Sequence, residues 1–279
     1  MLNTGLQDMN YSPDSCSSLF SGADSEISDV IWEGIDDADG TPAIQTVPPI
    51  PGLFFEPSLL LPQEMADSVL SFCNKTYFSS SESNQVMLFG RFLPPSSSPP
   101  LTSTSGLPKT LLDLLDTLST LLLPILPPDT HSLLFPTVPT RARQAIINLY
   151  QQGEGITPHV DLLGRYDDGI IGVSFSSGCA MRFDKVRTAD DERDERWDLY
   201  LPERSVIVLT KEARYNWTHG IDKKLKDFVS STMAPPNTIM NDGCSGTGTW
   251  IKRGVRMSIT FRWLLPGADV VGRSEQDEA

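Results

Sequence analysis

The stretch Arg256-Met-Ser-Ile-Thr-Phe-Arg262 alternates between polar and apolar side chains, and this alternation decides the class of fold. Successive side chains of a β-strand point to opposite faces, so the stretch predicts a strand with two different faces. One face carries Met257, Ile259 and Phe261, and the other carries Arg256, Ser258, Thr260 and Arg262. We therefore expect a strand whose two faces have different surroundings, as in a sheet that is covered differently on its two sides.

The two arginines of this strand predict a site for an anion. Their Cα atoms are roughly 20 Å apart along an extended chain, and two long side chains that lean toward each other leave a gap of a few ångström. A buried guanidinium needs partners, and its planar fork binds a carboxylate through two hydrogen bonds. Arg256 and Arg262 are therefore candidates to hold a short dicarboxylate, although two surface arginines on a half-exposed sheet would show the same spacing.

Two of the three histidines in the chain belong to a second pattern. The tripeptide His159-Val160-Asp161 is followed, 58 residues after its aspartate, by His219. In an extended segment His159 and Asp161 point to the same side, with Cα atoms roughly 6.6 Å apart, so both can reach one ion. Two imidazoles and one carboxylate on one face of a metal form the ligand set of non-haem Fe(II) oxygenases. Without the arginine strand, the tripeptide alone would more often be a surface loop.

Together these patterns resemble the AlkB-like Fe(II)/2-oxoglutarate dioxygenases, over a stretch from about Leu53 to Leu265. The resemblance is carried by Asn148, Tyr150, His159, Asp161, His219, Arg256, Ser258 and Arg262. It implies an α+β, mainly β protein with a double-stranded β-helix (jelly-roll) core and flanking N-terminal helices. It also implies the cofactors Fe(II), 2-oxoglutarate and O₂, with His159, Asp161 and His219 as the catalytic iron ligands.

The resemblance further implies how the co-substrate is held and what reaction follows. Arg256, Tyr150 and Ser258 would hold one end of 2-oxoglutarate. Arg262 and Asn148 would lie near the end that chelates iron. A substrate C–H bond would be hydroxylated while 2-oxoglutarate and O₂ are converted to succinate and CO₂. An oxidised N-methyl group would leave as formaldehyde, whereas a hydroxyl on a side-chain carbon would remain.

The segment from Glu212 to Ile221, with Arg253-Gly-Val-Arg256, is most similar to the eukaryotic branch that hydroxylates a modified wobble uridine in transfer RNA. This similarity favours a nucleic acid substrate, above all RNA, whose target base must be unpaired or flipped out. Ser258 departs from the asparagine of the bacterial relative but keeps a hydrogen-bonding side chain. A protein-directed hydroxylase or demethylase with the same iron site stays open, as does a DNA alkylation-repair dioxygenase. A small-molecule oxygenase and a non-catalytic module are less favoured.

The net charge of −14 is concentrated in the tails of the chain. Residues 1–50 contain nine acidic residues and no lysine or arginine, and the last eleven residues contain four acidic residues and one basic residue. The residues between hold 23 acidic and 21 basic side chains, so this part is nearly neutral. Local basic clusters can still contact phosphates. The candidates are Arg141 with Arg143, Lys223 with Lys224 and Lys226, and Lys252 with Arg253, although each cluster alone is more simply a set of solvated surface charges.

Composition and cysteine usage are typical of a soluble intracellular enzyme. A hydrophobic content of 39% over 279 residues suffices for one substantial core. No stretch reaches the roughly 20 apolar residues of a membrane span, and no secretory signal is visible at the start. The four cysteines form no Cys-x-x-Cys pair, which favours free thiols. We expect a monomer in the cytoplasm or nucleus, without membrane contact.

Changes in composition divide the chain into a tail, a domain and a second tail. We expect residues 1–48 to be a disordered acidic tail, residues 49–268 the dioxygenase domain, and residues 269–279 an acidic C-terminal tail. Within the domain, residues 94–108 form a Pro/Ser-rich loop, and residues 221–252 form an insertion between the last iron ligand and the arginine strand. Loops of this length are usually functional or disordered.

Local patterns predict the elements of the domain. Helices are expected after Pro62 and over Leu111–Leu123, where apolar residues recur at three- and four-residue spacing. A strand is expected over Gln85–Phe92. It supplies three candidate contacts to a substrate base, which are Phe89, Arg91 and Phe92, although such aromatics are more often part of a core. Further strands are expected over Ala145–Tyr150, Ile170–Ser176, Ala180–Val186, Arg196–Leu201, Ser205–Leu209 and Val255–Leu265.

Overall fold

The computed structural model describes residues 41–80, 83–90, 106–187, 194–231 and 247–268. All of them belong to one compact unit, which spans Asp39–Ala279. Most of the predicted N-terminal tail, most of the Pro/Ser-rich loop and the whole predicted C-terminal tail lie outside these ranges. Within the described ranges, no helix is long and apolar enough to cross a membrane.

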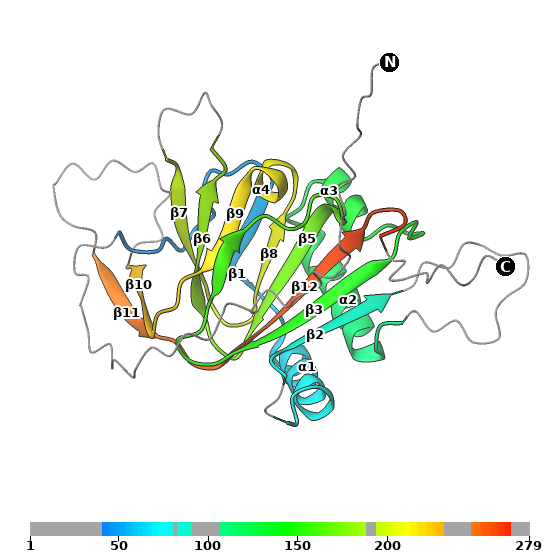
Figure 1. Ribbon diagram of the computed structural model, residues 1–279, viewed down its shortest axis with the longest axis horizontal. Helices are drawn as coiled ribbons and strands as arrows, with labels where there is room; N and C mark the ends of the chain where they lie inside the picture. The colour runs from blue at the N-terminus through cyan, green and yellow to red at the C-terminus, as the bar shows by residue number, and fades with distance from the viewer. Residues whose placement is uncertain (1–40, 81–82, 91–105, 188–193, 232–246, 269–279) are drawn as a thin grey trace, which may run out of the picture. The chain divides into compact units, whose positions relative to one another are not determined.

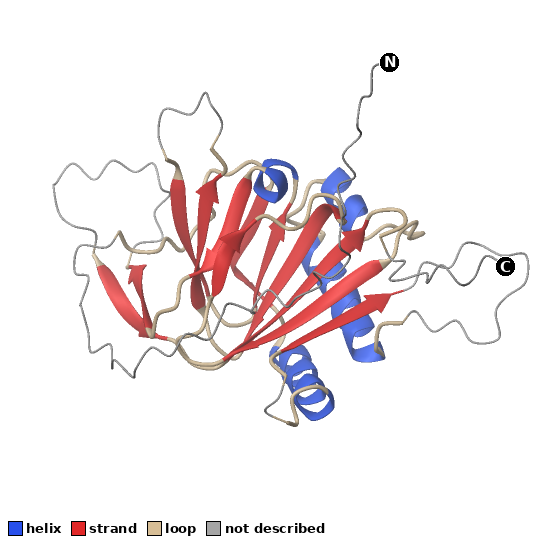
Figure 2. Ribbon diagram, viewed as in Figure 1, coloured by secondary structure: helices blue, strands red, loops and turns tan. Residues whose placement is uncertain are grey.

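Two antiparallel sheets and a two-stranded ribbon form the β part of the described chain (Figures 1 and 2). The larger sheet has the order β1 (Leu53–Leu60), β8 (Ser205–Leu209), β5 (Tyr166–Phe175), β12 (Arg256–Leu264), β3 (Arg143–Tyr150) and β2 (Gln85–Gly90). The smaller sheet has the order β4 (Ile156–His159), β9 (Trp217–Ile221), β6 (Cys179–Lys185) and β7 (Arg196–Leu201). The ribbon pairs β10 (Lys226–Ser230) with β11 (Gly248–Lys252).

The chain alternates between the two sheets in the manner of a jelly roll. From β3 it passes to β4 in the smaller sheet, to β5 in the larger, to β6 and β7 in the smaller, then to β8, β9 and β12 in turn. A buried apolar cluster joins the sheets through Ile170, Ile207 and Leu209 on one side and Phe183, Leu199, Leu201 and Trp217 on the other. The four-stranded halves β8-β5-β12-β3 and β4-β9-β6-β7 thus make the double-stranded β-helix, which confirms the predicted fold.

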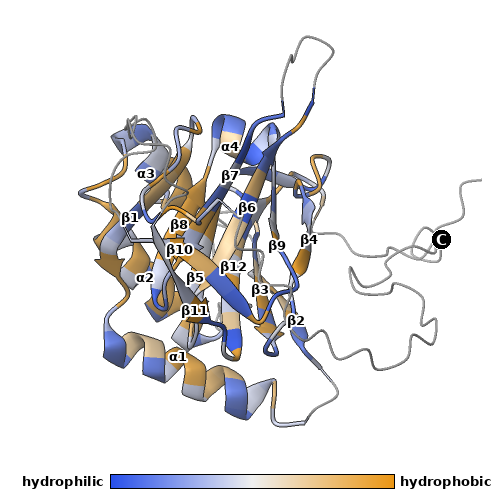
Figure 3. Ribbon diagram, turned by 90° about the vertical axis from the view of Figure 1, so that its left-hand side faces the viewer, coloured by the Kyte–Doolittle hydropathy of each residue, from blue (hydrophilic) through white to orange (hydrophobic). Residues whose placement is uncertain are grey.

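Two helices cover the other face of the larger sheet, α1 (Gln63–Thr76) and α2 (Lys109–Leu122) (Figure 2). The side of α2 that faces the sheet consists of Leu111, Leu114, Leu115, Leu118 and Leu122, all buried. Each fully buried leucine stabilises the fold by roughly 1.5–3 kcal/mol. Burial of these leucines therefore explains why the helix packs against the sheet. Figure 3 shows hydrophobic and hydrophilic residues interspersed along α1, as expected for a helix with one buried side.

The strand β12 separates its apolar residues from its arginines, as predicted from the alternation. Met257, Ile259 and Phe261 belong to the core cluster between the larger sheet and the helices, and each is at most 1% exposed. Arg256 and Arg262 therefore point to the opposite face, toward the space between the two sheets. This face carries the site described below.

The strand β5 begins four residues before its predicted start. The residues Asp167-Asp168-Gly169 are typical of a turn, which explains the shorter prediction. In the structure Gly169 has a φ of 88°, and the register of β5 against β12 shifts between Arg262 and Leu264. The strand therefore continues through an irregularity that a glycine permits.

Short elements were missed where the pattern is too brief to reveal a period. These are α3 (Pro128–Leu134), α4 (Lys211–Tyr215), β4, β9 and the two ribbon strands. The predicted insertion 221–252 contains the ribbon, while its middle, residues 232–246, lies outside the described part of the chain. In these elements polar and apolar residues are mixed without a clear repeat, whereas the equally short strand Ser205–Leu209 was predicted because four of its five residues are apolar.

Residues before position 49 already take part in the fold. The N–H of Ala43 donates to the carbonyl of Phe228 in β10, and the N–H of Ile44 donates to the carbonyl of Asp198 in β7, both at 2.8 Å. This short segment thereby joins the ribbon to the edge of the smaller sheet. These bonds place Ala43 and Ile44 within the described fold, ahead of the predicted boundary at residue 49, because pairing through the backbone does not require an apolar pattern.

Candidate metal centre and co-substrate site

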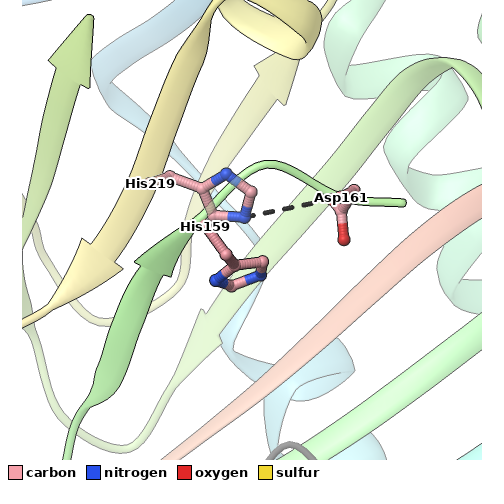
Figure 4. A group of neighbouring side chains, drawn as sticks. All are labelled: His159, Asp161 and His219. Atoms are coloured by element: carbon pink, nitrogen blue, oxygen red, sulfur yellow. Dashed lines mark ion pairs between the residues drawn. The ribbon is translucent and has the colours of Figure 1, made fainter. Parts of the chain in front are cut away.

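The pairing of β4 with β9 brings the two predicted histidine ligands together. His159 ends β4 and is the Cα partner of His219 in the middle of β9. Asp161 follows two residues later in the loop, and Figure 4 shows the three side chains around one space. One nitrogen of each imidazole and one carboxylate oxygen all lie within 4.8 Å of one another. The three predicted ligands thus form a group that could hold a metal ion.

The carboxylate of Asp161 has one satisfied oxygen and one open oxygen. Asp161 is 3% exposed, and its Oδ1 lies 2.8 Å from Nη2 of Arg262. Its Oδ2 lies 3.9 Å from Nε2 of His219 and has no hydrogen-bond partner among the described residues. A buried polar atom without a partner costs on the order of 1–3 kcal/mol, more when it is charged. The open oxygen therefore fits a bound cation.

The surroundings of both imidazoles fit metal binding. Nδ1 of His159 lies 2.9 Å from the carbonyl oxygen of Thr157, and a carbonyl can only accept, so Nδ1 donates to it and Nε2 is the nitrogen that remains for a metal. Burial lowers the pKa of His219 to about 4, although the charge of Asp161 opposes this shift. Neutral imidazoles and an ionised carboxylate are the forms that bind divalent metals. The donor set fits Fe(II), which accepts nitrogen and oxygen ligands.

A second open polar group lies at the start of β12. Arg256 is 6% exposed, and its Nη2 donates to Oγ of Ser174 at 2.9 Å. Its Nε and Nη1 have no hydrogen-bond partner within the described part of the chain. A buried cation with unused donors fits an anionic ligand, and a guanidinium suits a carboxylate in particular. This observation fits one end of 2-oxoglutarate.

The neighbouring strand β3 adds the remaining predicted co-substrate residues. In the register of β12 with β3, Arg256 lies opposite Tyr150, and Ser258 lies opposite Asn148. Burial raises the pKa of the Tyr150 hydroxyl, while Arg256 and hydrogen bonds with Ser258 and Asn148 lower it in part. Nε2 of Gln85 in β2 donates to Oδ1 of Asn148 at 2.7 Å. The structure therefore brings these side chains together beside Arg256.

Sequence reasoning missed one buried arginine of the metal site. Arg214 of α4 is 2% exposed, and it donates to the carbonyl oxygens of Asp161 and Tyr166 at 3.0 Å and of Asp167 at 3.4 Å. It thereby holds the loop that carries Asp161 against the helix that leads into β9. The signal was present in the segment Glu212–Ile221, but a sequence does not reveal which carbonyls an arginine will meet.

Of the candidate base contacts on the predicted strand Gln85–Phe92, only Phe89 is described. Phe89 is partly buried and packs against a small cluster that contains Tyr166. The guanidinium of Arg262 lies 4.9 Å from the centroid of the Tyr166 ring. Phe89 thus belongs to the layer next to Arg262. Arg91 and Phe92 lie outside the described residues.

The three candidate phosphate-binding lysines have different surroundings. Lys223 and Lys224 are exposed in the connection between β9 and β10, and Nζ of Lys224 lies 3.3 Å from a carboxylate oxygen of Asp222. Lys226 begins β10, and its Nζ lies 4.4 Å from the ring centroid of Trp250 in β11. The sequence did not single out Trp250, whose cross-strand neighbours come from residues more than twenty positions away.

Comparison with known proteins agrees with this geometry. The model of the 2OG-Fe(II) oxygenase superfamily matches residues 96–262, more than half of the chain. An uncharacterized protein of Acanthamoeba polyphaga mimivirus is 33% identical over 122 residues, which are 44% of this chain and 48% of that protein. The tRNA (carboxymethyluridine(34)-5-O)-methyltransferase ALKBH8 of Mus musculus is 36% identical over 119 residues, which are 43% of this chain and 17% of that protein.

A third relative is the N6-methyladenosine RNA demethylase ALKBH of Cryphonectria parasitica, 37% identical over 114 residues, which are 37% of this chain and 50% of that protein. The matches therefore span half of these relatives' length or less. The family match contains the three candidate metal ligands and both arginines of β12. The chain belongs to the 2OG-Fe(II) oxygenase superfamily, as an AlkB-like dioxygenase whose cofactors are Fe(II), 2-oxoglutarate and O₂.

Proposed function

We propose that the protein oxidises a modified base in RNA, most directly in transfer RNA, by hydroxylation or by oxidative demethylation. The observation that carries the chemistry is the carboxylate oxygen of Asp161 that has no hydrogen-bond partner among the described residues and lies beside two imidazoles. Support for RNA comes from two relatives whose names specify a transfer-RNA carboxymethyluridine and N6-methyladenosine in RNA.

Three side chains would hold the iron, and a fourth would orient one of these three. His159, Asp161 and His219 supply two nitrogens and one oxygen. Arg262 donates to Oδ1 of Asp161, which turns Oδ2 toward the imidazoles. When bound, iron and its co-substrate would supply the oxidising power that a C–H bond requires. The protein would determine which C–H bond of the substrate lies close to the metal.

The co-substrate would lie along the polar face of β12. Arg256 would bind the carboxylate remote from iron through its free Nε and Nη1, because both donors lack partners in the described chain. Tyr150 and Ser258 would add hydroxyl groups at this end, and Asn148 would lie toward the metal. The row of donors along one strand face would keep 2-oxoglutarate in a single orientation.

The substrate base must reach the metal from outside the sheets. A base stacked in a duplex cannot approach a site between two sheets, so the target would be a loop nucleotide or a flipped base. Transfer RNA presents such unpaired bases without the cost of opening a helix. If the oxidised carbon is an N-methyl group, the product loses formaldehyde; if it is a ring substituent, the hydroxyl stays.

The proposal is tested by incubating the purified full chain with Fe(II), 2-oxoglutarate and transfer RNA. Succinate is measured together with mass spectrometry of the nucleosides. We expect succinate in the absence of RNA at a low rate, a higher rate with RNA, and one nucleoside whose mass changes by an oxygen or by a lost methyl group. Asp161→Ala should abolish both signals, because it removes one of three ligands. Lys109→Gln, an exposed change on α2, serves as the control.

Two outcomes would contradict the proposal at different levels. Undiminished succinate from His219→Ala would remove this residue from the ligand set. Oxidation of a peptide but of no nucleoside would keep the dioxygenase and replace RNA by a protein substrate.

A further inference from the structure

The ribbon of β10 and β11 has two faces of opposite character. Side chains alternate along each strand, and directly paired residues share a face. Asp227 and Val229 lie on the inner face and are at most 4% exposed. The outer face contains two cross-strand pairs, Lys226 with Lys252 and Phe228 with Trp250. The outer positions of the described ribbon therefore carry two ammonium groups and two aromatic rings, and none of them carries a carboxylate.

The inner face fixes the ribbon to the domain. Nε and Nη2 of Arg253 donate to the two carboxylate oxygens of Asp227 at 2.7 and 2.6 Å, and Oδ2 of Asp227 accepts the N–H of Ala180 in β6 at 3.1 Å. The edge of β10 that does not pair with β11 forms backbone hydrogen bonds with Ala43. The outer face is thus held in place by the sheet that also carries His159 and His219.

The two aromatic rings form a shallow platform. Their centroids are 5.1 Å apart with an angle of 36° between the planes. A Cβ atom at Gly248 would come within 2.6 Å of the Phe228 ring, so the absence of a side chain there lets this ring lie across the strand. Trp250 remains 40% exposed, although large aromatic side chains are normally well buried. Nζ of Lys226 lies 4.4 Å from the centre of the indole.

We propose that this outer face binds a single strand of nucleic acid, with one base stacked on Trp250 and the neighbouring phosphates beside Lys226 and Lys252. Proteins that bind single strands combine aromatic platforms with cationic groups along the backbone path, and this ribbon has both within two residue pairs. The proposal rests on the proposed RNA substrate and adds a docking surface outside the metal site. The positive outer face complements a polyanion, and the exposed indole selects one that carries flat bases over an acidic peptide.

The test measures binding of a short fluorescent oligouridylate to the full chain by anisotropy. Trp250→Ala should weaken binding by about tenfold, the lower part of the range for loss of one stacked base. Trp250→Phe should restore most of the affinity, because a flat ring remains. Replacement of Lys226 and Lys252 by Gln should lower the slope of log affinity against log salt by roughly 1.4, about 0.7 per lost contact. The paired change Lys75→Gln with Lys109→Gln removes two exposed charges from the helices and should leave the slope unchanged.

Succinate formation without RNA is measured on the same proteins, and it should equal that of the unaltered chain in every variant. Oligouridylate affinity that is the same in Trp250→Ala, in the lysine pair and in the unaltered chain would overturn the surface. If polyglutamate displaced the labelled oligouridylate as effectively as unlabelled oligouridylate does, the result would overturn the proposal in favour of an acidic peptide. A chain that forms succinate but binds no oligouridylate would overturn both the surface and the RNA substrate, whereas ribbon-dependent binding without succinate formation would overturn only the proposed oxidation.

Discussion

Arg253 and Arg256 are three residues apart and equally buried, at 6% exposed, yet their surroundings are opposite. Arg253 uses Nε and Nη2 for the carboxylate of Asp227, and its Nη1 donates to the carbonyl of Asp222 at 2.6 Å. Arg256 has one hydrogen bond, to Ser174, and two nitrogens without a partner in the described chain. We call the guanidinium of Arg253 closed, because its donors have partners within the chain, and that of Arg256 open, because two of its nitrogens have none among the described residues.

The difference separates a structural charge from a candidate ligand-binding charge. Burial by itself would lower the pKa of Arg253, but the hydrogen bonds and the charge of Asp227 outweigh burial and raise it. A buried cation whose donors are filled from within the chain stabilises a particular packing. A buried cation with open donors is costly until an anion arrives. Arg253 therefore anchors the ribbon, and Arg256 is ready for a carboxylate.

The largest effect is expected at the closed arginine. Arg253→Ala leaves Asp227 buried and unpaired, and it should lower the free energy of unfolding by about 3–5 kcal/mol. Denaturation by urea measures the change. Replacing both residues together, Arg253→Met with Asp227→Leu, should recover most of the loss, because neither charge is then stranded. A loss below about 1 kcal/mol in the single variant would show that the pair does not anchor the ribbon.

The open arginine should show the reverse profile. Arg256→Ala should weaken 2-oxoglutarate binding by an amount on the order of 2–5 kcal/mol, the usual cost of removing one partner of a buried charged pair. Its free energy of unfolding without ligand should be unchanged or higher, since an unpartnered charge is removed. Anaerobic calorimetry of the iron-loaded chain gives the first quantity and urea denaturation the second. Equal destabilisation of both arginine variants would abolish the distinction.

Arg214 is closed as well, but by neutral carbonyls. Arg214→Lys keeps the charge, but a single ammonium group cannot reach three acceptors that lie around a planar guanidinium. We therefore expect the free energy of unfolding to fall by about 2 kcal/mol, the contribution of one or two hydrogen bonds. Because one acceptor is the carbonyl of Asp161, affinity for Fe(II) should fall in parallel. Titration with Co(II), followed by its visible absorption, separates the two effects. Metal affinity that stayed constant despite lower stability would leave Arg214 with a structural role alone.

Arg262 is an intermediate case, with one carboxylate partner and an Nε that has none among the described residues. Arg262→Lys keeps a charge near Asp161 but loses the planar fork. Changes in residues that orient a ligand of a metal typically cost 10- to 100-fold in metal affinity, and we expect roughly tenfold here. Binding of 2-oxoglutarate should weaken with it. Affinity for both at the level of the unaltered chain would show that any cation suffices at this position.

The smallest effect is expected on the opposite face of the same strand. Met257→Leu conserves volume in the core and should cost less than about 1.5 kcal/mol of stability. Affinity for 2-oxoglutarate should not change, since Met257 points away from the site. A loss like that of Arg256→Ala would mean that the two faces of β12 are assigned the wrong way round.

Several features followed from local pattern, because their cause is local. The alternation in β12 predicted both of its faces, and the leucine spacing of α2 predicted a helix with one buried side. The spacing of His159 and Asp161 predicted that both would reach one ion, and the resemblance to a family added His219. In each case the information lies within one strand, one helix or one recognised motif.

Other features depended on partners that are distant in sequence. Arg253 meets Asp227 across 26 positions, and Ala43 pairs with a strand that lies more than 180 positions away. The start of β5 depended on an irregularity opposite β12. The role of Arg214 depended on the carbonyl of Asp161 and on two carbonyls at the start of β5. A pattern search cannot foresee these contacts, since each is a product of how the sheets pack.

The sequence by itself determined the donor types of the site: two imidazoles, a carboxylate and two guanidinium groups, in an order along the chain that suits an AlkB-like oxygenase. Side-chain chemistry is carried by residue identity, so it can be read without coordinates. Which of these groups are already satisfied was decided by tertiary packing alone. Contacts between distant segments supply partners to the side chain of Arg253, whereas among the described residues Asp161 Oδ2 and two nitrogens of Arg256 have none. The same packing turned Trp250 and its lysines outward on a ribbon whose other face is anchored in the domain.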